Sequence, residues 1–163
     1  MQAQRSHQGE ALRAAWTPRA STLAWARVDA SEAAAVFART PCNRLLGMQL
    51  VARSRERAEV VLPMRDDLLQ EAGLVQGGLL TALADAAAVW LLWPELPAGR
   101  TMTGTDCSMH FLRPARGSGG DLRAIATLVK GGRTLLVVDS HVHQGERLVA
   151  RGTFTFLQME QQP

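Results

Sequence analysis

Asp85 is the residue whose surroundings most strongly suggest chemistry, because it is the one charged group in a long apolar stretch. Residues 77–93 consist mostly of alanine, leucine and valine. An ionised aspartate is costly to bury unless it is paired or hydrogen-bonded, so its presence here needs an explanation. We expect Asp85 either to have a function, or to accept hydrogen bonds from backbone groups or from an arginine at a subunit contact.

Gly77 and Gly78 stand at the start of this stretch, where a helix would begin. The first N–H groups of a helix have no intrahelical partner, and they lie at the positive end of the helix dipole. Such a terminus can bind a developing oxyanion, and glycine lets a ligand approach the backbone closely. The alternative is that the glycine pair forms a simple turn.

The histidines and cysteines give weaker indications of chemistry than Asp85 and the glycine pair. The four histidines have no evident carboxylate partner, which favours solvated or packing roles over metal binding: His7, His110, His141 and His143. Cys42 and Cys107 are far apart in the sequence and have no metal-ligand spacing, so we expect two reduced thiols and no metal site.

The stretch that carries Asp85 predicts a helix over residues 77–93, which Pro94 and Pro97 end. Because this helix is apolar on every side, the rest of the fold must enclose most of its circumference. The alanines around Asp85 allow a neighbouring backbone to approach closely.

Strand-like patterns occur on both sides of this helix. Two precede it, at residues 47–53 and 57–62, and a polar loop at residues 65–71 follows them. Four come after it, separated by glycine-rich turns, at residues 103–112, 122–129, 134–143 and 148–157. We expect an antiparallel meander from these four. A curved sheet wrapped around the helix would bury it most economically, which predicts an α+β architecture of the hotdog type.

The chain of 163 residues, 47% of them hydrophobic, has the length and core of one domain. Residues 1–30 show no sustained periodicity and are expected to be an N-terminal extension, so the domain covers residues 31–163. A short helix is predicted at its start, with Ser31 as the N-cap and an end before Pro41.

The net charge of +3 comes almost wholly from arginine, since Lys130 is the only lysine. The arginines are scattered, which argues against nucleic acid and is compatible with a small anionic ligand or with a solvated surface. Neither an uninterrupted apolar run of spanning length nor a secretory signal is evident. We expect a cytoplasmic protein without a membrane partner.

Several motifs in this order resemble the PaaI-like (phenylacetate-pathway type) hotdog thioesterases. Residues 73–78 followed by Asp85 are similar to the family's helix entry, N-x-x-G-x-x-H-G-G-x-x-x-x-L-x-D, with the same spacing. The similarity continues through residues 111–115, 132–134, 148–150 and 152–154, and covers roughly residues 36–158.

The resemblance implies a dimer, often paired into a dimer of dimers, in which two sheets join edge to edge and each active site borrows residues from both chains. The residue at the position of Asp85 would act as general base or nucleophile, and the Gly77 N–H would polarise the thioester carbonyl. Gln76 stands where the family has histidine, and Gln70 where it has asparagine. Both amides can donate a hydrogen bond, but Gln76 cannot take up a proton near neutral pH.

The same resemblance suggests where the substrate binds. Gly78 would lie against it, and Thr105 or Thr103 would replace a serine that many relatives have at Gly104. The remaining candidates would hold the phosphates of coenzyme A, although as turn residues they could equally be solvated: Arg113, Lys130, Gly131 and Arg133. Coenzyme A is then part of the substrate, and no separate cofactor is expected.

The leading functional hypothesis is an acyl-CoA thioesterase with Asp85, Gly77, Gln70 and Gln76 in its catalytic machinery. A second hypothesis is a hotdog module that binds acyl-CoA without efficient hydrolysis, which the absent histidine suggests. A hydratase or dehydratase is less favoured, because no histidine stands beside a carboxylate at the helix entry.

Overall fold

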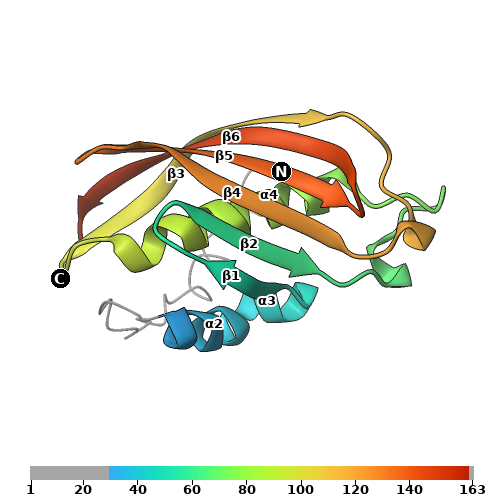
Figure 1. Ribbon diagram of the computed structural model, residues 1–163, viewed down its shortest axis with the longest axis horizontal. Helices are drawn as coiled ribbons and strands as arrows, with labels where there is room; N and C mark the ends of the chain where they lie inside the picture. Colours follow the sequence, from blue (N-terminus) through green and yellow to red (C-terminus); the bar gives the residue numbers. More distant parts are fainter. Residues whose placement is uncertain (1–29, 162–163) are drawn as a thin grey trace, which may run out of the picture.

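The computed structural model describes residues 30–161, in which a curved antiparallel sheet wraps around one central helix (Figure 1). The central helix is α4 (Gly77–Leu92), continued by the short 3-10 turn η2 (Trp93–Glu95). The sheet consists of six strands: β1 (Gln49–Arg53), β2 (Arg57–Leu62), β3 (Arg100–Phe111), β4 (Leu122–Gly131), β5 (Leu135–Gln144) and β6 (Arg147–Glu160). The predicted hotdog architecture is confirmed.

The order of the strands in the sheet is β1-β2-β4-β5-β6-β3, and every pairing is antiparallel. The prediction of a four-strand meander after the helix is therefore wrong for β3. This strand pairs with β6 at the far edge, and the chain then crosses to β4, which lies beside β2. Residue alternation indicates which face of a strand is buried, but it does not indicate which strand is the neighbour.

The core lies between α4 and the inner face of the sheet. On β2 and β4 the inward residues are small or branched and fully buried, for example Ala58, Val60, Ala124 and Ala126. These side chains let the helix approach the sheet closely, as the alanines of α4 predict. Larger groups close the core toward the other edge, among them Phe154 and Phe156 of β6.

Arg53 of β1 caps the carboxyl end of α4 with hydrogen bonds. Its guanidinium donates to the carbonyl oxygens of Trp90 (3.0 Å) and Leu91 (3.4 Å), and it forms an ion pair with Glu95 at 2.7 Å. These carbonyls belong to the last turn of the helix, where they have no intrahelical donor, and a cation there also interacts favourably with the helix dipole.

The beginning of the domain differs from the prediction. Helix α2 (Ala30–Arg39) starts one residue before Ser31, so Ser31 lies inside it and is not its N-cap. Pro41, expected only to end this helix, also begins a second one, α3 (Pro41–Leu46), because proline is well tolerated in the first turn. The two helices lie beside β1 (Figure 1). The predicted extension falls outside the described residues except for Ala30, and two short 3-10 turns, η1 (Asp66–Leu68) and η3 (Gly117–Gly119), lie in the loops.

The segment from Gly77 to Glu95 is long and apolar enough to cross a membrane by length and composition alone. In this fold it packs against β2, β4, β5 and β6, and more than half of it is buried there. It is accordingly the core helix of the domain.

Candidate active site

Asp85 lies on the one face of α4 that the sheet leaves open. Gly78, Ala82, Asp85 and Val89 follow one another at helical spacing, and each is exposed or half-buried, whereas most of the helix is buried. Asp85 itself is exposed in the single protomer. The fold therefore encloses most of the helix circumference, as expected, and leaves this stripe open.

A hollow of about 320 Å³ surrounds Asp85. Its walls come from β3 and β6: Gly104, Thr105, Asp106, Cys107, Phe154 and Phe156. The register places Gly104 beside Phe156 and Cys107 beside Phe154, on the side of the sheet that faces α4. The carboxylate thus shares a mostly apolar hollow with two phenylalanine side chains.

Partial burial raises the pKa of Asp85, because desolvation disfavours the charged carboxylate. The side chain remains open to solvent on one side, so the shift reflects the apolar walls rather than full enclosure. Within residues 30–161 it has no hydrogen bond and no ion pair. Backbone groups of the described residues therefore do not hold the carboxylate, and the alternative of an arginine at a subunit contact stays a prediction.

A second hollow, of about 260 Å³, lies at the amino end of α4. Gly77 and Gln70 both line it, together with residues 111–115, which connect β3 to the next loop. Gly77 is the first residue of the helix, so its N–H has no intrahelical acceptor. The prediction of a helix entry rather than a simple turn is confirmed.

Gln76 and Gly78 flank this entry. Gln76 is the N-cap residue of α4, and its exposed side chain makes no capping hydrogen bond, so the amide is available to a ligand. Gly78 is exposed, and a methyl group added to it would meet nothing within 4 Å. The second hollow therefore gathers backbone and amide donors, and no carboxylate lines it.

The two hollows are separate within one protomer. Gly77 and Asp85 are eight positions apart on one helix, which corresponds to about 12 Å along its axis. A carbonyl oxygen that accepts from the Gly77 N–H is too far from the carboxylate of the same chain for direct proton transfer. The structure brings Gln70 to Gly77, but it does not bring Asp85 to either of them.

Thr105 occupies a bulge in β3, where the register shifts between Gly104 and Asp106. Its hydroxyl donates to the Thr155 carbonyl oxygen at 3.2 Å, and the residue lines the hollow of Asp85. Thr103 pairs with Leu157 on the outer face of the sheet. Of the two predicted substitutes for a serine at Gly104, Thr105 alone lies at the hollow.

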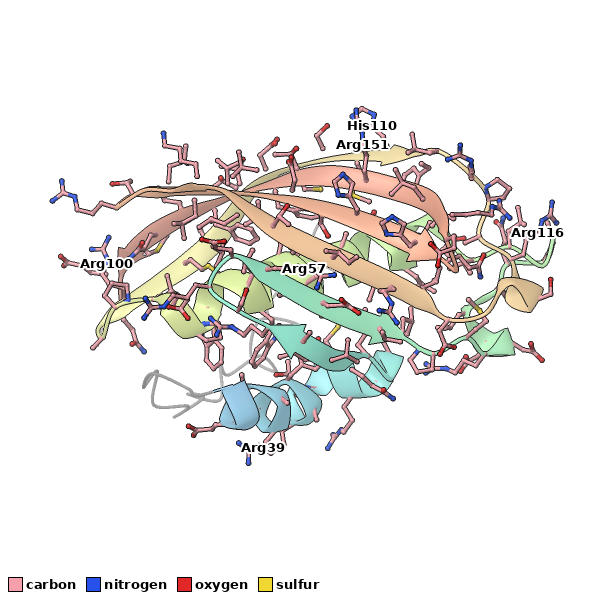
Figure 2. The ribbon with its side chains drawn as sticks, in the orientation of Figure 1. Arg39, Arg57, Arg100, His110, Arg116 and Arg151 are labelled. Carbon is pink, nitrogen blue, oxygen red and sulfur yellow. The ribbon has the colours of Figure 1, made fainter. Side chains whose placement is uncertain are left out.

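The four predicted phosphate-binding residues do not gather in one place. Arg113 lines the hollow of Gly77 and donates to the Leu148 carbonyl oxygen at 2.9 Å. Lys130, Gly131 and Arg133 lie in and beside the β4–β5 turn, where the Arg133 carbonyl accepts from Arg100 at the other end of β3. Figure 2 shows Arg100 and Arg116 at opposite ends of the sheet. The 12 residues of β3 span about 36 Å, so this turn is remote from Arg113 in one protomer.

Gln144 is a residue that the sequence analysis missed. Its buried amide accepts from the Arg116 N–H (2.9 Å) and donates to the carbonyl oxygens of Arg116 (2.7 Å) and Gly120 (2.9 Å). The loop it holds is bonded in turn to the helix entry, since Val75 donates to the Ala115 carbonyl at 2.9 Å. Gln144 therefore supports the wall of the Gly77 hollow from behind.

The strand histidines lie elsewhere. The register puts His110, His141 and His143 on the outer face of the sheet, turned away from α4 and from both hollows. No group of three potential metal ligands gathers within the part of the chain that the structure describes. The candidate site thus consists of a carboxylate hollow and a donor hollow on one helix.

The sequence and the fold have known counterparts. Residues 72–151 match the model of the family described as the thioesterase superfamily. A phenylacetic acid degradation-related protein from Ralstonia eutropha is 30% identical and superposes with a TM-score of 0.68 over 72% of this chain and 89% of that chain. The chain belongs to the thioesterase superfamily. The resemblance found in the sequence is confirmed.

Two further relatives of this thioesterase-superfamily chain are also described as a thioesterase family protein or an esterase. A thioesterase family protein from Silicibacter pomeroyi is 26% identical and covers 79% of this chain and 96% of that chain, with a TM-score of 0.72. A curated Haemophilus influenzae protein named "Putative esterase" is 30% identical over 92 residues, which is 56% of this chain and 65% of that protein. The match spans slightly less than two thirds of this curated relative.

Proposed function

We propose that the protein is an acyl-CoA thioesterase that works as a homodimer or a dimer of dimers in the cytoplasm. The observation that carries the proposal is the division of α4 between a donor hollow at Gly77 and an open hollow with an unpaired carboxylate at Asp85. Thioester hydrolysis needs both kinds of group, because an oxyanion develops while water must lose a proton.

The edge strand β3 supports a dimer. It pairs with β6 on one side only, and residues 103–108 are exposed on both of its faces. A long edge strand presents unpaired N–H and C=O groups, which a second copy could satisfy by antiparallel pairing around a two-fold axis. The open face of α4 would then meet its counterpart. In that arrangement the Asp85 of one chain approaches the Gly77 hollow of the other.

The reaction then uses a water molecule and the thioester. Asp85 takes a proton from water, whose oxygen attacks the carbonyl carbon, or the carboxylate attacks that carbon itself. The Gly77 N–H and the Gln70 amide donate to the oxyanion that forms. The C–S bond then breaks, and the sulfur of coenzyme A takes the proton that Asp85 removed from water and leaves as a thiol. In the nucleophilic route, a water molecule hydrolyses the acyl-Asp85 anhydride and supplies that proton. Gln76, at the N-cap position, contributes a hydrogen-bond donor.

The nucleotide end of the substrate is anionic and attracts arginine. Arg113 lines the donor hollow, and Thr105 lines the hollow of Asp85. Thr105 and the open backbone at Gly78 contact the substrate nearer its thioester. Lys130, Gly131 and Arg133 can act at the same site only from the second chain, because they lie at the far end of β3. No cofactor beyond the coenzyme A of the substrate is needed.

A second candidate is a module that binds acyl-CoA without efficient hydrolysis. Gln76 favours it, because this residue stands at the helix entry with a side chain that cannot accept a proton near neutral pH. Tight binding of intact acyl-CoA with no thiol release would support this alternative.

The experiment measures free thiol released from aromatic and aliphatic acyl-CoAs by the wild type and by Asp85→Asn. We expect turnover to fall at least about 100-fold in the variant, as for loss of a general base. Asp106→Asn is the matched control, since Asp106 lines the same hollow from β3 but its side chain follows the outer-face register with Thr155. Equal activity of Asp85→Asn and wild type would contradict the role of Asp85.

A further inference from the structure

A polar hollow of about 250 Å³ lies on the outer face of the sheet, on the opposite side from α4. Its lining residues come from three adjacent strands: Ser108 and His110 of β3, Asp139 and His141 of β5, and Arg151, Gly152 and Thr153 of β6. The thioesterase chemistry proposed above uses none of them. Figure 2 shows His110 and Arg151 next to each other, pointing away from the central helix.

The strand register arranges the polar side chains in two rows. Arg151 is directly opposite His110 on one side and His141 on the other, which makes a row of three nitrogen donors. Side chains directly opposite each other in neighbouring strands have their Cβ atoms about 5 Å apart. One small ligand can therefore contact all three donors.

The second row adds hydroxyl groups and one carboxylate. Thr153 lies opposite Ser108 and Asp139, and its hydroxyl donates to Asp139 Oδ1 at 2.6 Å. That bond leaves Asp139 Oδ2 as an acceptor beside the donor row. The hollow thus combines several donors with a single carboxylate.

The donor row has no counter-charge of its own. Arg151 forms no hydrogen bond or ion pair with another residue between 30 and 161, and it is exposed. On the neighbouring strand β4, Arg123 forms an ion pair with the buried Glu59. The ring centroid of His143 lies 6.5 Å from that of His141. The carboxylate nearest the row in the strand register, Asp139, is already engaged by Thr153.

We propose that this hollow binds a phosphate group that carries a proton, as inorganic hydrogen phosphate or as a protonated phosphate monoester. Arg151 and the two imidazoles donate to the phosphate oxygens, because guanidinium and imidazole N–H groups match such acceptors. The P–OH group donates to Asp139. Sulfate has the same shape but no proton near neutral pH, so the carboxylate repels it.

The proposal is compatible with dimerisation through β3. Edge pairing of strands uses backbone groups, which leaves outward side chains such as His110 at the outer surface. A second pair of sheets packed face to face on this surface would instead cover the hollow and prevent binding.

The test is isothermal titration of the full chain at pH 7 and constant ionic strength with inorganic phosphate, phenyl phosphate and sulfate. We expect phosphate to bind at least about tenfold more tightly than sulfate, and Arg151→Gln to weaken phosphate binding at least about tenfold, the scale of one charge-assisted hydrogen bond. Arg147→Gln removes the same charge from the same strand and should change the affinity less than twofold. Phenyl phosphate, which has no proton left in its dianion, should bind more tightly at pH 5.5 than at pH 7 if the P–OH donor matters.

Asp139→Asn separates recognition of the proton from simple attraction of an anion. The amide no longer repels sulfate, so we expect phosphate and sulfate to bind this variant about equally. Equal binding of the two anions by the wild type, an Arg151→Gln affinity equal to that of the wild type, or no phosphate binding would each overturn the proposal. Circular dichroism of every variant checks that the sheet is intact.

Discussion

The two hollows along α4 differ in what they contain, although they lie on the same helix. The hollow at its amino end has the free N–H of Gly77, the Gln70 amide and Arg113, and no carboxylate lines it. The hollow two turns further on has the Asp85 carboxylate among phenylalanine side chains, and no lysine, arginine or histidine lines it. One hollow can stabilise negative charge, and the other can accept a proton.

Under the proposed thioesterase mechanism, this difference makes a single protomer incomplete as a catalyst. About 12 Å of helix separates the groups, and no flexible connection can shorten that distance. Each hollow is also lined in part by residues of β3, the edge strand with an unpaired side. The proposed mechanism therefore requires the donor hollow of one chain to meet the carboxylate hollow of another.

The largest effect should come from removing the donor at the helix entry. Gly77→Pro deletes one backbone N–H, and proline is tolerated at the first position of a helix, so α4 should still form. We expect kcat to fall about 100- to 1,000-fold, as for loss of an oxyanion donor. Gly77→Ala keeps the N–H, and its methyl group would meet the Phe111 ring at an ordinary 3.5 Å. If both variants lose activity equally, the N–H is not the important group.

A smaller loss should follow from loosening the wall of the donor hollow. Gln144→Met removes three hydrogen bonds to the loop at residues 116–120 and leaves those backbone groups unsatisfied. We expect kcat to fall roughly tenfold through misplacement of the helix entry. Ser140→Ala is the control, because this fully buried hydroxyl on the same strand has no partner among the described residues. Measurements of kcat and KM, together with thermal melting of each variant, distinguish a loss of catalysis from a loss of stability.

The pH dependence of kcat/KM should show whether Asp85 in the carboxylate hollow is the catalytic base. A base must be ionised, and partial burial raises the pKa of Asp85, so activity should disappear as the pH falls through that raised value. We expect the acidic limb of kcat/KM to lie above the ordinary aspartate range near pH 4. A limb at or below that range would indicate that Asp85 is not the base.

The smallest expected effect concerns stability. A carboxyl with a raised pKa in the folded state favours folding at low pH, and this contribution is lost as the pH rises through the folded pKa. Asp85→Asn should therefore raise the Tm by a few degrees at most at pH 7. The difference should vanish below about pH 4, where wild-type Asp85 also carries its proton. A lower Tm at pH 7 would mean that the carboxylate makes a stabilising contact.

The helix and its two chemical groups could be predicted because their signals are local. A glycine pair, an apolar run, one aspartate and two prolines define α4 almost to the residue. Strand alternation likewise located all six strands within a few residues. These patterns depend on neighbours in sequence, which a single chain displays directly.

Long-range pairing could not be predicted in the same way. Nothing in the alternation of β3 indicates that it pairs with β6 rather than β4. Gln144 reads as an ordinary strand residue, because its partners at Arg116 and Gly120 are more than 20 positions away.

The most direct test of a site shared between chains is to mix two inactive variants. Asp85→Asn keeps the donor hollow, and Gly77→Pro keeps the carboxylate, so a heterodimer contains one intact site. We predict that co-refolded equal amounts regain about a quarter of the wild-type activity per chain, because half of the dimers are mixed and each has one intact site of two. If the mixture stays as inactive as the separate variants while it forms mixed dimers, the site lies within one chain and the account is wrong.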